Sequence, residues 1–259
     1  MAKRVSESNG AERRAVRLYL SDGLAPGAAV ELTAEQAHRL RNVLRLGPGA
    51  PLAGFNERDG EWLCRLGEVG RNRASLAVER LLRPAEPEPD LWLLFAPIKR
   101  ARLDWLVEKA TELGAAALVP VWTARTQPER LNAERLHALA LAAAEQCGRL
   151  SVPRIASPEP LDQVLLGWPA GRLLVLCDES GSGMPIAEAL AGVPPHAQAA
   201  LLVGPEGGFA DRELDALGKL PIVRRVGLGP RVLRAETAVL AALAVFQAIA
   251  GDWRRARLR

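Results

Sequence analysis

Cysteine and histidine are scarce in this sequence. The three cysteines, Cys64, Cys147 and Cys177, are odd in number and far apart, and they form no C-x-x-C pair. This usage argues against a disulfide framework and against a cysteine-based zinc site. The three histidines are equally scattered, so we expect no metal. A reduced, cytoplasmic compartment is consistent with this pattern.

Long apolar runs and a leader sequence are also missing. No segment approaches the ~18 uninterrupted apolar residues of a membrane span, so we expect no membrane partner. Residues 1–15 are charged and polar and contain no apolar core of a secretory signal. We therefore predict a flexible basic tail there, and a second basic tail over residues 252–259.

What remains has the composition of a globular protein. The chain has 259 residues, of which 49% are hydrophobic and 25% charged, enough for one large domain or two ordinary ones. The net charge of +4 is compatible with a polyanionic partner. Only four of its basic residues are lysines, namely Lys3, Lys99, Lys109 and Lys219. The arginine excess either serves bidentate phosphate contacts or reflects a biased composition.

A proline-rich acidic stretch divides the chain. RPAEPEPD, residues 83–90, resists helix and cannot pack as a core, so we predict a linker there. Before it, Thr33 and Gln36 form a capping box that opens a helix over residues 34–44. The rest of residues 16–82 consists of short β-type runs, which predict a small β-barrel: Val16–Leu20, Pro51–Phe55, Trp62–Leu66 and Ser75–Leu82.

After the linker, residues 91–251 alternate between apolar strands and helices. The strands are expected at residues 91–97, 116–122, 172–178, 199–204 and 223–228. The helices are expected at residues 99–113, 132–147, 185–190, 210–217 and 236–250. Because each strand is apolar throughout, the pattern predicts an α/β fold, a parallel sheet with helices on both faces.

Glycine-rich loops follow two of these strands. Gly204-Pro205-Glu206-Gly207-Gly208 ends one apolar strand, and Gly227-Leu228-Gly229-Pro230 ends the next. In a parallel sheet such loops, together with residues 178–181, can converge on one pocket beyond the carboxyl ends of the strands. Neither loop matches a Rossmann or Walker motif, so the pocket should favour a ligand read by main-chain hydrogen bonds and apolar walls. Tight strand-to-helix turns are the alternative.

Five segments together resemble one known family. GPEGGF (204–209) and LGPRVLRAETA (228–238) resemble the RsmE family of bacterial 16S rRNA (uracil-N3)-methyltransferases, in the SPOUT superfamily. RNVLRLGPG (41–49), EKATELG (108–114) and AEQCGR (144–149) resemble further family segments in the same order. Ala124-Arg125-Thr126 departs from the E-R-S that members usually carry there.

The resemblance implies properties that the residues alone do not. The second domain would be a SPOUT-type trefoil-knotted sheet that binds S-adenosylmethionine, and the first a PUA-like barrel that holds RNA. The enzyme would be a homodimer. It would methylate N3 of one uridine, conventionally numbered 1498, in the 16S rRNA of the small ribosomal subunit.

The same resemblance suggests site residues. We expect Arg234 to stabilise the uracil N3 anion and Glu236 to orient Arg234 or accept the proton, although an Arg234–Glu236 salt bridge or a helix-dipole role for Glu236 would be simpler. The expected cofactor-binding residues are Leu176, Gly204, Pro205, Glu206, Gly207, Gly208, Leu228, Gly229, Val232, Leu233, Thr237 and Ala238. The expected RNA-binding residues, each of which is alternatively a solvated side chain, are Arg17, Arg41, Arg45, Lys99, Arg100, Arg102, Arg125 and Arg149.

The helix expected over residues 236–250 is apolar nearly all round, so either the domain core or a second subunit must cover it.

Three rival functions stay open at this point. One is a SPOUT methyltransferase with a different RNA target, and another is a non-catalytic RNA-binding adaptor. The third, a nucleotide-dependent enzyme, is disfavoured because phosphate motifs are missing.

Overall fold

The chain forms two compact units. The computed structural model describes residues 16–71, 73–126, 131–195 and 197–254. The first unit contains Met1–Pro87 and Glu145–Ser151, and the second contains Glu88–Ala144 and Val152–Arg259. The division after Pro87 falls inside the expected linker, residues 83–90. The inclusion of Glu145–Ser151 in the first unit has no local signal in the sequence.

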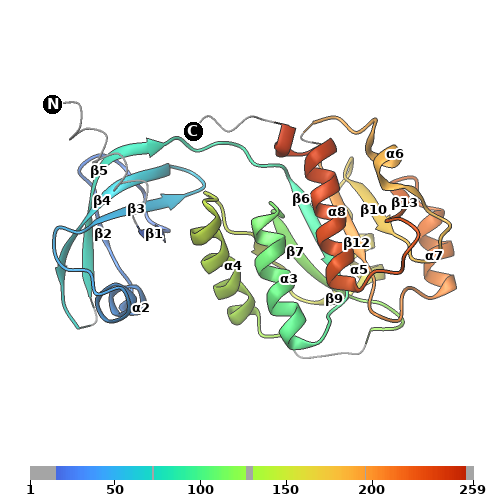
Figure 1. Cartoon of the computed structure of the whole chain (residues 1–259), viewed down its shortest axis with the longest axis horizontal. Coiled ribbons are helices and arrows are strands. Elements are labelled where there is room, and N and C mark those ends of the chain that lie inside the picture. Colours follow the sequence, from blue (N-terminus) through green and yellow to red (C-terminus); the bar gives the residue numbers. More distant parts are fainter. Residues whose placement is uncertain (1–15, 72, 127–130, 196, 255–259) are drawn as a thin grey trace. The chain divides into compact units, whose positions relative to one another are not determined.

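The first unit is built on a five-stranded sheet (Figure 1). Its strands are β1 (Val16–Tyr19), β2 (Ala29–Glu31), β3 (Pro51–Asn56), β4 (Gly60–Val69) and β5 (Ala74–Arg83). The order is β1-β3-β4-β5-β2, in which β1 and β3 run parallel and the other neighbours antiparallel. The four predicted strands are confirmed. In this order β1 and β2 are the two edges, so the closed barrel stays a prediction.

One hydrophobic core packs against this sheet. Leu18 of β1, Leu52 of β3 and Leu76 of β5 are almost completely buried in it. β2 is the strand that the sequence does not reveal, because only Val30 of its three residues is buried. A strand of this length has too few alternating positions to give a pattern.

The helix of the first unit begins as predicted but does not stay α-helical. In α2 (Ala34–His38) the Gln36 N–H donates to Thr33 Oγ1 over 3.2 Å, and the Gln36 side chain accepts from the Thr33 N–H. The chain then widens into the π-helical segment η1 (Arg39–Val43). Arg45 follows with a φ of 54°, in the left-handed region that non-glycine residues seldom adopt.

The second unit contains an eight-stranded parallel sheet. Its strands are β6 (Leu91–Phe95), β7 (Ala117–Trp122), β8 (Arg154–Ile155), β9 (Glu159–Pro160), β10 (Leu173–Cys177), β11 (Met184–Pro185), β12 (Ala199–Val203) and β13 (Val223–Gly227). The order is β11-β13-β10-β12-β6-β7-β8, with β9 beside β7. The five predicted strands are confirmed and form the centre. The two-residue strands β8, β9 and β11 are too short to show a pattern.

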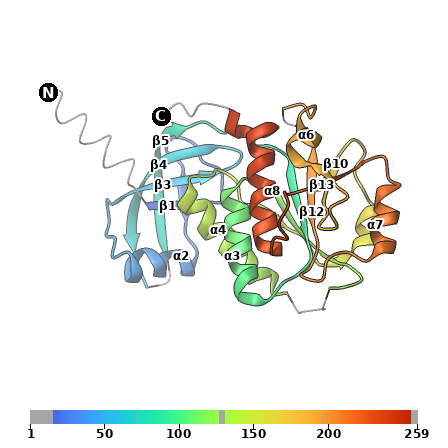
Figure 2. The same cartoon turned by 45° about the vertical axis from the view of Figure 1, so that its right-hand side comes forward.

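Helices cover both faces of this sheet, as predicted (Figures 1 and 2). One face packs against α3, α4, α6 and α8, and the other against α5 and α7. The bounds are α3 (Arg100–Glu112), α4 (Ala133–Cys147), α5 (Leu161–Leu166), α6 (Ile186–Leu190), α7 (Asp211–Gly218) and α8 (Ala235–Ile249). Gly114 and Gly148 follow α3 and α4 with φ of 83° and 85°, which fits their predicted place after a helix end. The trefoil knot stays a prediction.

The last helix, α8, is covered on one side by its own domain. Val239, Leu243 and Phe246 are completely buried against the sheet and α3. The short 3₁₀-helix η2 (Asp252–Arg254) follows.

The remainder of the expected C-terminal tail and the expected N-terminal tail lie outside the described residues. In the parts of the chain that the structure describes, no helix is both long enough and apolar enough to cross a membrane.

The central strand gives a direct test of this packing. Leu201 of β12 is completely buried, whereas Leu166 at the end of α5 is 80% exposed. We expect Leu201→Ala to lower the free energy of unfolding by about 2–5 kcal/mol because it leaves a cavity. Leu166→Ala should change it by no more than about 0.5 kcal/mol. Urea unfolding of both variants measures the difference, and equal effects would contradict the assignment of β12 to the core.

Candidate functional site

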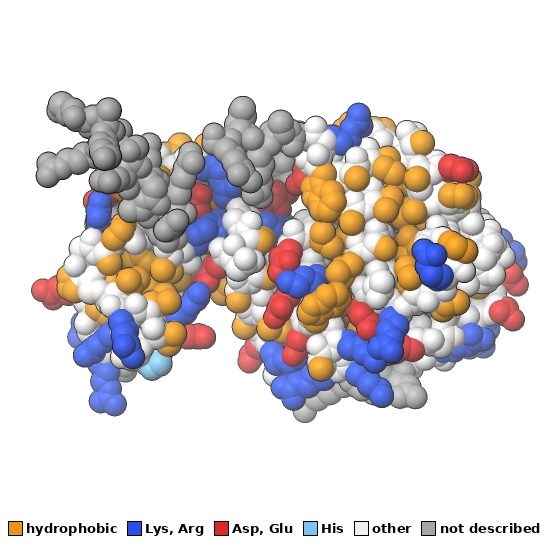
Figure 3. All heavy atoms as spheres, in the orientation of Figure 1, with side chains coloured by type: hydrophobic (Ala, Val, Ile, Leu, Met, Phe, Trp, Pro, Cys, Tyr) orange, Lys and Arg blue, Asp and Glu red, His pale blue; other side chains and the backbone are white. Residues whose placement is uncertain are grey.

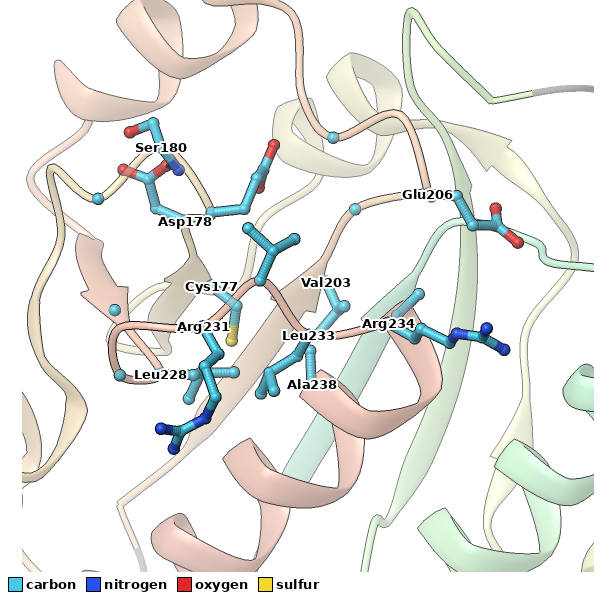
Figure 4. Close-up of a pocket in the computed structure, with 18 of the residues that line it drawn as sticks. Cys177, Asp178, Ser180, Val203, Glu206, Leu228, Arg231, Leu233, Arg234 and Ala238 are labelled. Atoms are coloured by element: carbon cyan, nitrogen blue, oxygen red, sulfur yellow. Dashed lines mark hydrogen bonds between the residues drawn. The ribbon is translucent and has the colours of Figure 1, made fainter.

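A cavity of about 390 Å³ opens at the carboxyl ends of three neighbouring strands (Figure 4). It is lined by residues 177–181 at the end of β10, 203–206 and 208 at the end of β12, and 227–235 at the end of β13, together with Ala238 of α8. Because β13, β10 and β12 are adjacent and parallel, their ends lie side by side at one edge of the sheet. The prediction that these three loops converge on one pocket is confirmed.

Close contacts explain two glycines in the loop after β12. A Cβ at Gly204 would lie 2.9 Å from the Phe209 ring, which is closer than packing allows. Gly208 has a φ of 66°, and a Cβ there would overlap the Glu179 carboxylate. That carboxylate accepts a hydrogen bond from the Phe209 N–H over 3.0 Å. Glu179 therefore joins the loops after β10 and β12, and only glycine at 208 lets it approach.

The same loop is also held from its other side. Arg125, in the loop after β7, donates through Nη1 to the Gly207 carbonyl over 2.8 Å. The neighbouring Ala124 N–H donates to one carboxylate oxygen of Glu213, whose other oxygen accepts from the Ala210 N–H. Glu213 thus also satisfies a free N–H at the start of α7. These bonds fix the outer edge of the loop that lines the cavity.

The loop after β10 carries a buried ion pair. Asp178 accepts hydrogen bonds from Arg225 of β13 and from the Ser180 N–H. Burial acts to raise the pKa of Asp178, but these bonds outweigh it and the pKa is lowered overall. Burial, with Glu179 nearby, raises the pKa of Cys177 to about 12. Asp178 is therefore ionised and Cys177 is a neutral thiol at neutral pH.

The cavity is lined by aliphatic side chains and by charged residues of both signs, namely Asp178, Glu179, Glu206, Arg231 and Arg234. Cys177, Val203 and Leu233 lie around its centre, as the close-up shows (Figure 4). The guanidinium groups of Arg231 and Arg234 extend away from this apolar cluster in opposite directions (Figure 4). The arrangement suits a ligand with an apolar or aromatic body and a charged end.

Comparison with known proteins places the second unit in a methyltransferase family. Residues 85–247 match the model of an RNA methyltransferase domain. The ribosomal RNA small subunit methyltransferase E of Rickettsia conorii is 31% identical, over 88% of this chain and 93% of that protein. The protein of the same name from Bacillus subtilis is 30% identical, over 82% of this chain and 87% of that protein. The chain belongs to the methyltransferase E family.

Solved structures agree with this family assignment. A methyltransferase of Legionella pneumophila in complex with S-adenosylmethionine has a TM-score of 0.79 and 31% identity, and covers 92% of this chain and 99% of its own. The methyltransferase E of Neisseria gonorrhoeae, bound to S-adenosylmethionine, has a TM-score of 0.80 and 27% identity. It covers 93% of this chain and 100% of its own.

Most cofactor residues expected from the methyltransferase E resemblance line the cavity. They are Gly204, Pro205, Glu206, Gly208, Leu228, Gly229, Val232, Leu233 and Ala238. Val232 does so from the surface, since it is 84% exposed. Gly207 and Thr237 are not among the lining residues. Leu176 is also not a lining residue, because its side chain is completely buried on the face of the sheet that α5 and α7 cover.

Several lining residues are absent from the set expected of a family member. They are Cys177, Asp178, Glu179, Ser180, Gly181, Val203, Gly227, Pro230, Arg231 and Ala235. The sequence could have identified residues 178–181 by their place, because they directly follow an apolar strand and therefore lie at the edge of the sheet where the pocket was expected. Side chains alternate along a strand, so Cys177 faces the cavity where Leu176 does not.

The two expected catalytic residues are not paired with each other. Arg234 is exposed at the N-cap of α8 and lines the cavity. Glu236 instead lies 3.6 Å from Arg102 of α3, and Glu206 lies 3.8 Å from the same guanidinium. The simpler expectation of an Arg234–Glu236 salt bridge is therefore wrong, and Arg102 is not a freely solvated side chain.

The remaining expected RNA-binding residues fall into two groups, those with little solvent exposure and those with exposed side chains. Arg17 faces Glu61, stacks on the Phe55 ring and donates to the Glu145 and Arg149 carbonyls. It thereby binds the segment Glu145–Ser151 to the first unit, a structural role that the sequence does not reveal. The Arg17 side chain is 15% exposed. Arg149 is buried, at 9% exposure, and donates to Ser151. The exposed members of the set are Arg41, Arg45, Lys99, Arg100 and Arg125.

No metal centre is visible in the residues that are described here: none of their histidine, cysteine and acidic side chains gather in groups of three or more that could hold an ion. Around the cavity, Asp178 pairs with Arg225, and Glu179 accepts a hydrogen bond from the Phe209 N–H.

The two adjacent glycines of the loop provide a matched pair of substitutions. Gly208→Ala should cost about 1–3 kcal/mol of stability, because it combines left-handed strain with displacement of the Glu179 carboxylate. Gly207→Ala should cost at most about 0.5 kcal/mol, because the nearest atoms to a Cβ there belong to Arg125 at 3.7 Å. Urea unfolding measures both values, and hydrogen exchange should speed up at the Phe209 amide in the Gly208 variant alone. Equal behaviour of the two variants would refute the Glu179 contact.

Proposed function

We propose that this chain methylates N3 of a single uridine, 1498 by convention, in the 16S rRNA of the small ribosomal subunit, with S-adenosylmethionine as methyl donor. The observation that carries the proposal is the single cavity formed by the three loops, in a chain that belongs to the methyltransferase E family. We place this activity in the cytoplasm, where small subunits are assembled.

The cavity fits S-adenosylmethionine on its own chemistry. The aliphatic side chains of Leu228 and Leu233 would wall the adenine, and the main chain around Gly204 and Gly229 would read its edge. The glycines allow the close main-chain approach that such reading needs. When bound, S-adenosylmethionine supplies an electrophilic methyl group on sulfur.

The residues of this chain would prepare the acceptor. Uracil N3–H is a weak imide acid, and its anion places charge on two carbonyl oxygens. A cation beside one of these oxygens favours the anion. Arg234 fits this role because it lines the cavity, is exposed, and has no ion-pair partner among the described residues. Glu236, two residues on, is our candidate to accept the proton.

Exposed cations would hold the RNA. In the first unit, Arg41 and Arg45 project from the η1 segment and the turn after it. In the second unit, Lys99 and Arg100 precede and open α3, and Arg125 lies against the outer side of the loop after β12. Such contacts to phosphates position a nucleic acid without reading its sequence. We retain these five as RNA-binding residues and remove Arg17 and Arg149, whose guanidinium groups bond within the first unit.

A second copy of the chain would cover the outer side of α8. Ala241, Ala244 and Val245 are half-buried and Ala248 is exposed on this side, and hydrophobic side chains gather over this part of the second unit (Figure 3). Contiguous apolar surface of this kind is typical of a protein interface. We therefore propose that the active form is a homodimer with α8 at the interface.

The function is tested with small ribosomal subunits from a strain that lacks the endogenous activity. Incubation with the protein and S-adenosylmethionine should produce one reverse-transcription stop at the proposed uridine, because an N3 methyl group blocks base pairing. Arg234→Ala should lower kcat by about 10²-fold or more if its guanidinium stabilises the anion. Arg212→Ala is the matched control, since Arg212 is exposed on α7 and lies outside the cavity.

The outcomes separate the rival functions. A stop at another nucleotide would indicate a methyltransferase with a different target. Binding of S-adenosylmethionine without methyl transfer to the small subunit would also redirect the search to other RNAs. Absence of both binding and transfer would favour an RNA-binding adaptor and would refute the proposal.

The proposed dimer is tested with one exposed alanine. Ala248→Glu should shift the sedimentation coefficient toward that of a monomer, because burying an unpaired carboxylate in an interface is unfavourable. Ala216→Glu is the control, since Ala216 is exposed on α7. A wild-type protein that sediments as a monomer at micromolar concentration would contradict the proposal.

A further inference from the structure

The N-terminus of α3 has an unusual charge distribution. Lys99, Arg100 and Arg102 lie at its start, and its first turn has no acidic residue. Cations at this end oppose the helix dipole, which favours anions there. Lys99 and Arg100 are exposed, whereas the Arg102 side chain is only 37% exposed and lies between two carboxylates.

These two carboxylates belong to different elements, and only Glu206 lines the cavity. Glu206 lies in the loop after β12, which lines the cavity, and Glu236 lies in the first turn of α8, two residues after Arg234. Arg102 comes from a third element, α3, and does not line the cavity. One guanidinium therefore connects the proposed cofactor loop with the proposed reactive end of α8.

The two contacts differ in environment. The Glu236 side chain is 12% exposed, and its buried Oε2 has no hydrogen-bond partner among the described residues. A carboxylate in such surroundings requires a nearby cation, and Arg102 supplies it. Glu206 is 46% exposed, so its pairing with Arg102 is a weak surface interaction. Both distances, 3.6 and 3.8 Å, exceed hydrogen-bond length, which leaves room for the guanidinium to tighten on either partner.

Building on the proposed function, we propose that Arg102 is a positioning residue for methyl transfer. It holds the Glu236 carboxylate, and with it the start of α8 that carries Arg234, in a fixed relation to the loop of Glu206. This role replaces the direct RNA contact that the sequence suggests for Arg102. Its contribution passes through Glu236, so loss of either residue should remove the same contribution.

A double-mutant cycle in full-length protein tests this coupling. Arg102→Gln and Glu236→Gln should each lower kcat by about 10- to 100-fold, as misplacement of a reacting group does. The double variant should be no slower than the slower single variant, because the effects of coupled residues do not add. The Kd for S-adenosylmethionine, measured by calorimetry, should change much less than kcat.

Two further variants guard against a purely structural explanation. Arg102→Lys keeps the charge but loses the fork that faces two carboxylates, so its kcat should lie between those of the wild type and Arg102→Gln. Arg212→Gln, an exposed arginine in the first turn of α7, should retain wild-type kcat and KM. Thermal unfolding of each variant checks that the fold is intact, and if Arg102→Gln does not fold, the cycle is closed with Arg102→Lys.

The results that would overturn the role of Arg102 differ from the result that would refute the proposed function. A higher KM for the ribosomal subunit with unchanged kcat in Arg102→Gln would show that Arg102 holds RNA, and would overturn the inference. Multiplying effects on kcat in the double variant would also overturn it, because independent residues act additively in free energy. In both of these cases the wild-type protein is active, so the proposed function is not contradicted. A wild-type protein that neither binds S-adenosylmethionine nor transfers a methyl group would instead refute the proposed function, and the inference with it.

Discussion

The parallel packing of β13, β10 and β12 is the constraint on which the site depends. Parallel neighbours direct their carboxyl ends to the same edge, so loops that are some twenty to fifty residues apart along the chain meet there. β10 and β12 are apolar strands whose residues are packed by helices on both faces, and Val226 of β13 is buried in the same core. The cavity is thus a consequence of the sheet order.

Side-chain contacts with main-chain groups then give the loops their shape. Glu179 reaches the Phe209 N–H, and Arg125 reaches the Gly207 carbonyl, so the loop after β12 is held from two sides. Both contacts leave the cavity-facing main chain available to a ligand. The glycines therefore serve two purposes, since they admit these neighbouring side chains and also permit close ligand approach.

Burial divides the many arginines into different roles. Arg17 and Arg149 stabilise the first unit, and Arg102 joins two carboxylates beside the cavity. The exposed cations, such as Lys99 and Arg125, keep donors available for phosphate. The excess of arginine over lysine suits both groups, because a planar guanidinium can face several acceptors at once.

The sequence by itself determined the five central strands and five of the helices of the second unit, since apolar runs, capping signals and glycine stops are local features. It did not indicate α5 or the two-residue strands β8, β9 and β11. It also indicated the GPEGG loop as a candidate ligand-binding loop, with a tight turn as the alternative. Only the tertiary structure decided that Leu176 is a core residue while Cys177 faces the cavity, that Glu145–Ser151 belongs to the first unit, and that Glu236 pairs with Arg102. These outcomes depend on which distant residues become neighbours, and no periodicity within a single segment contains that information.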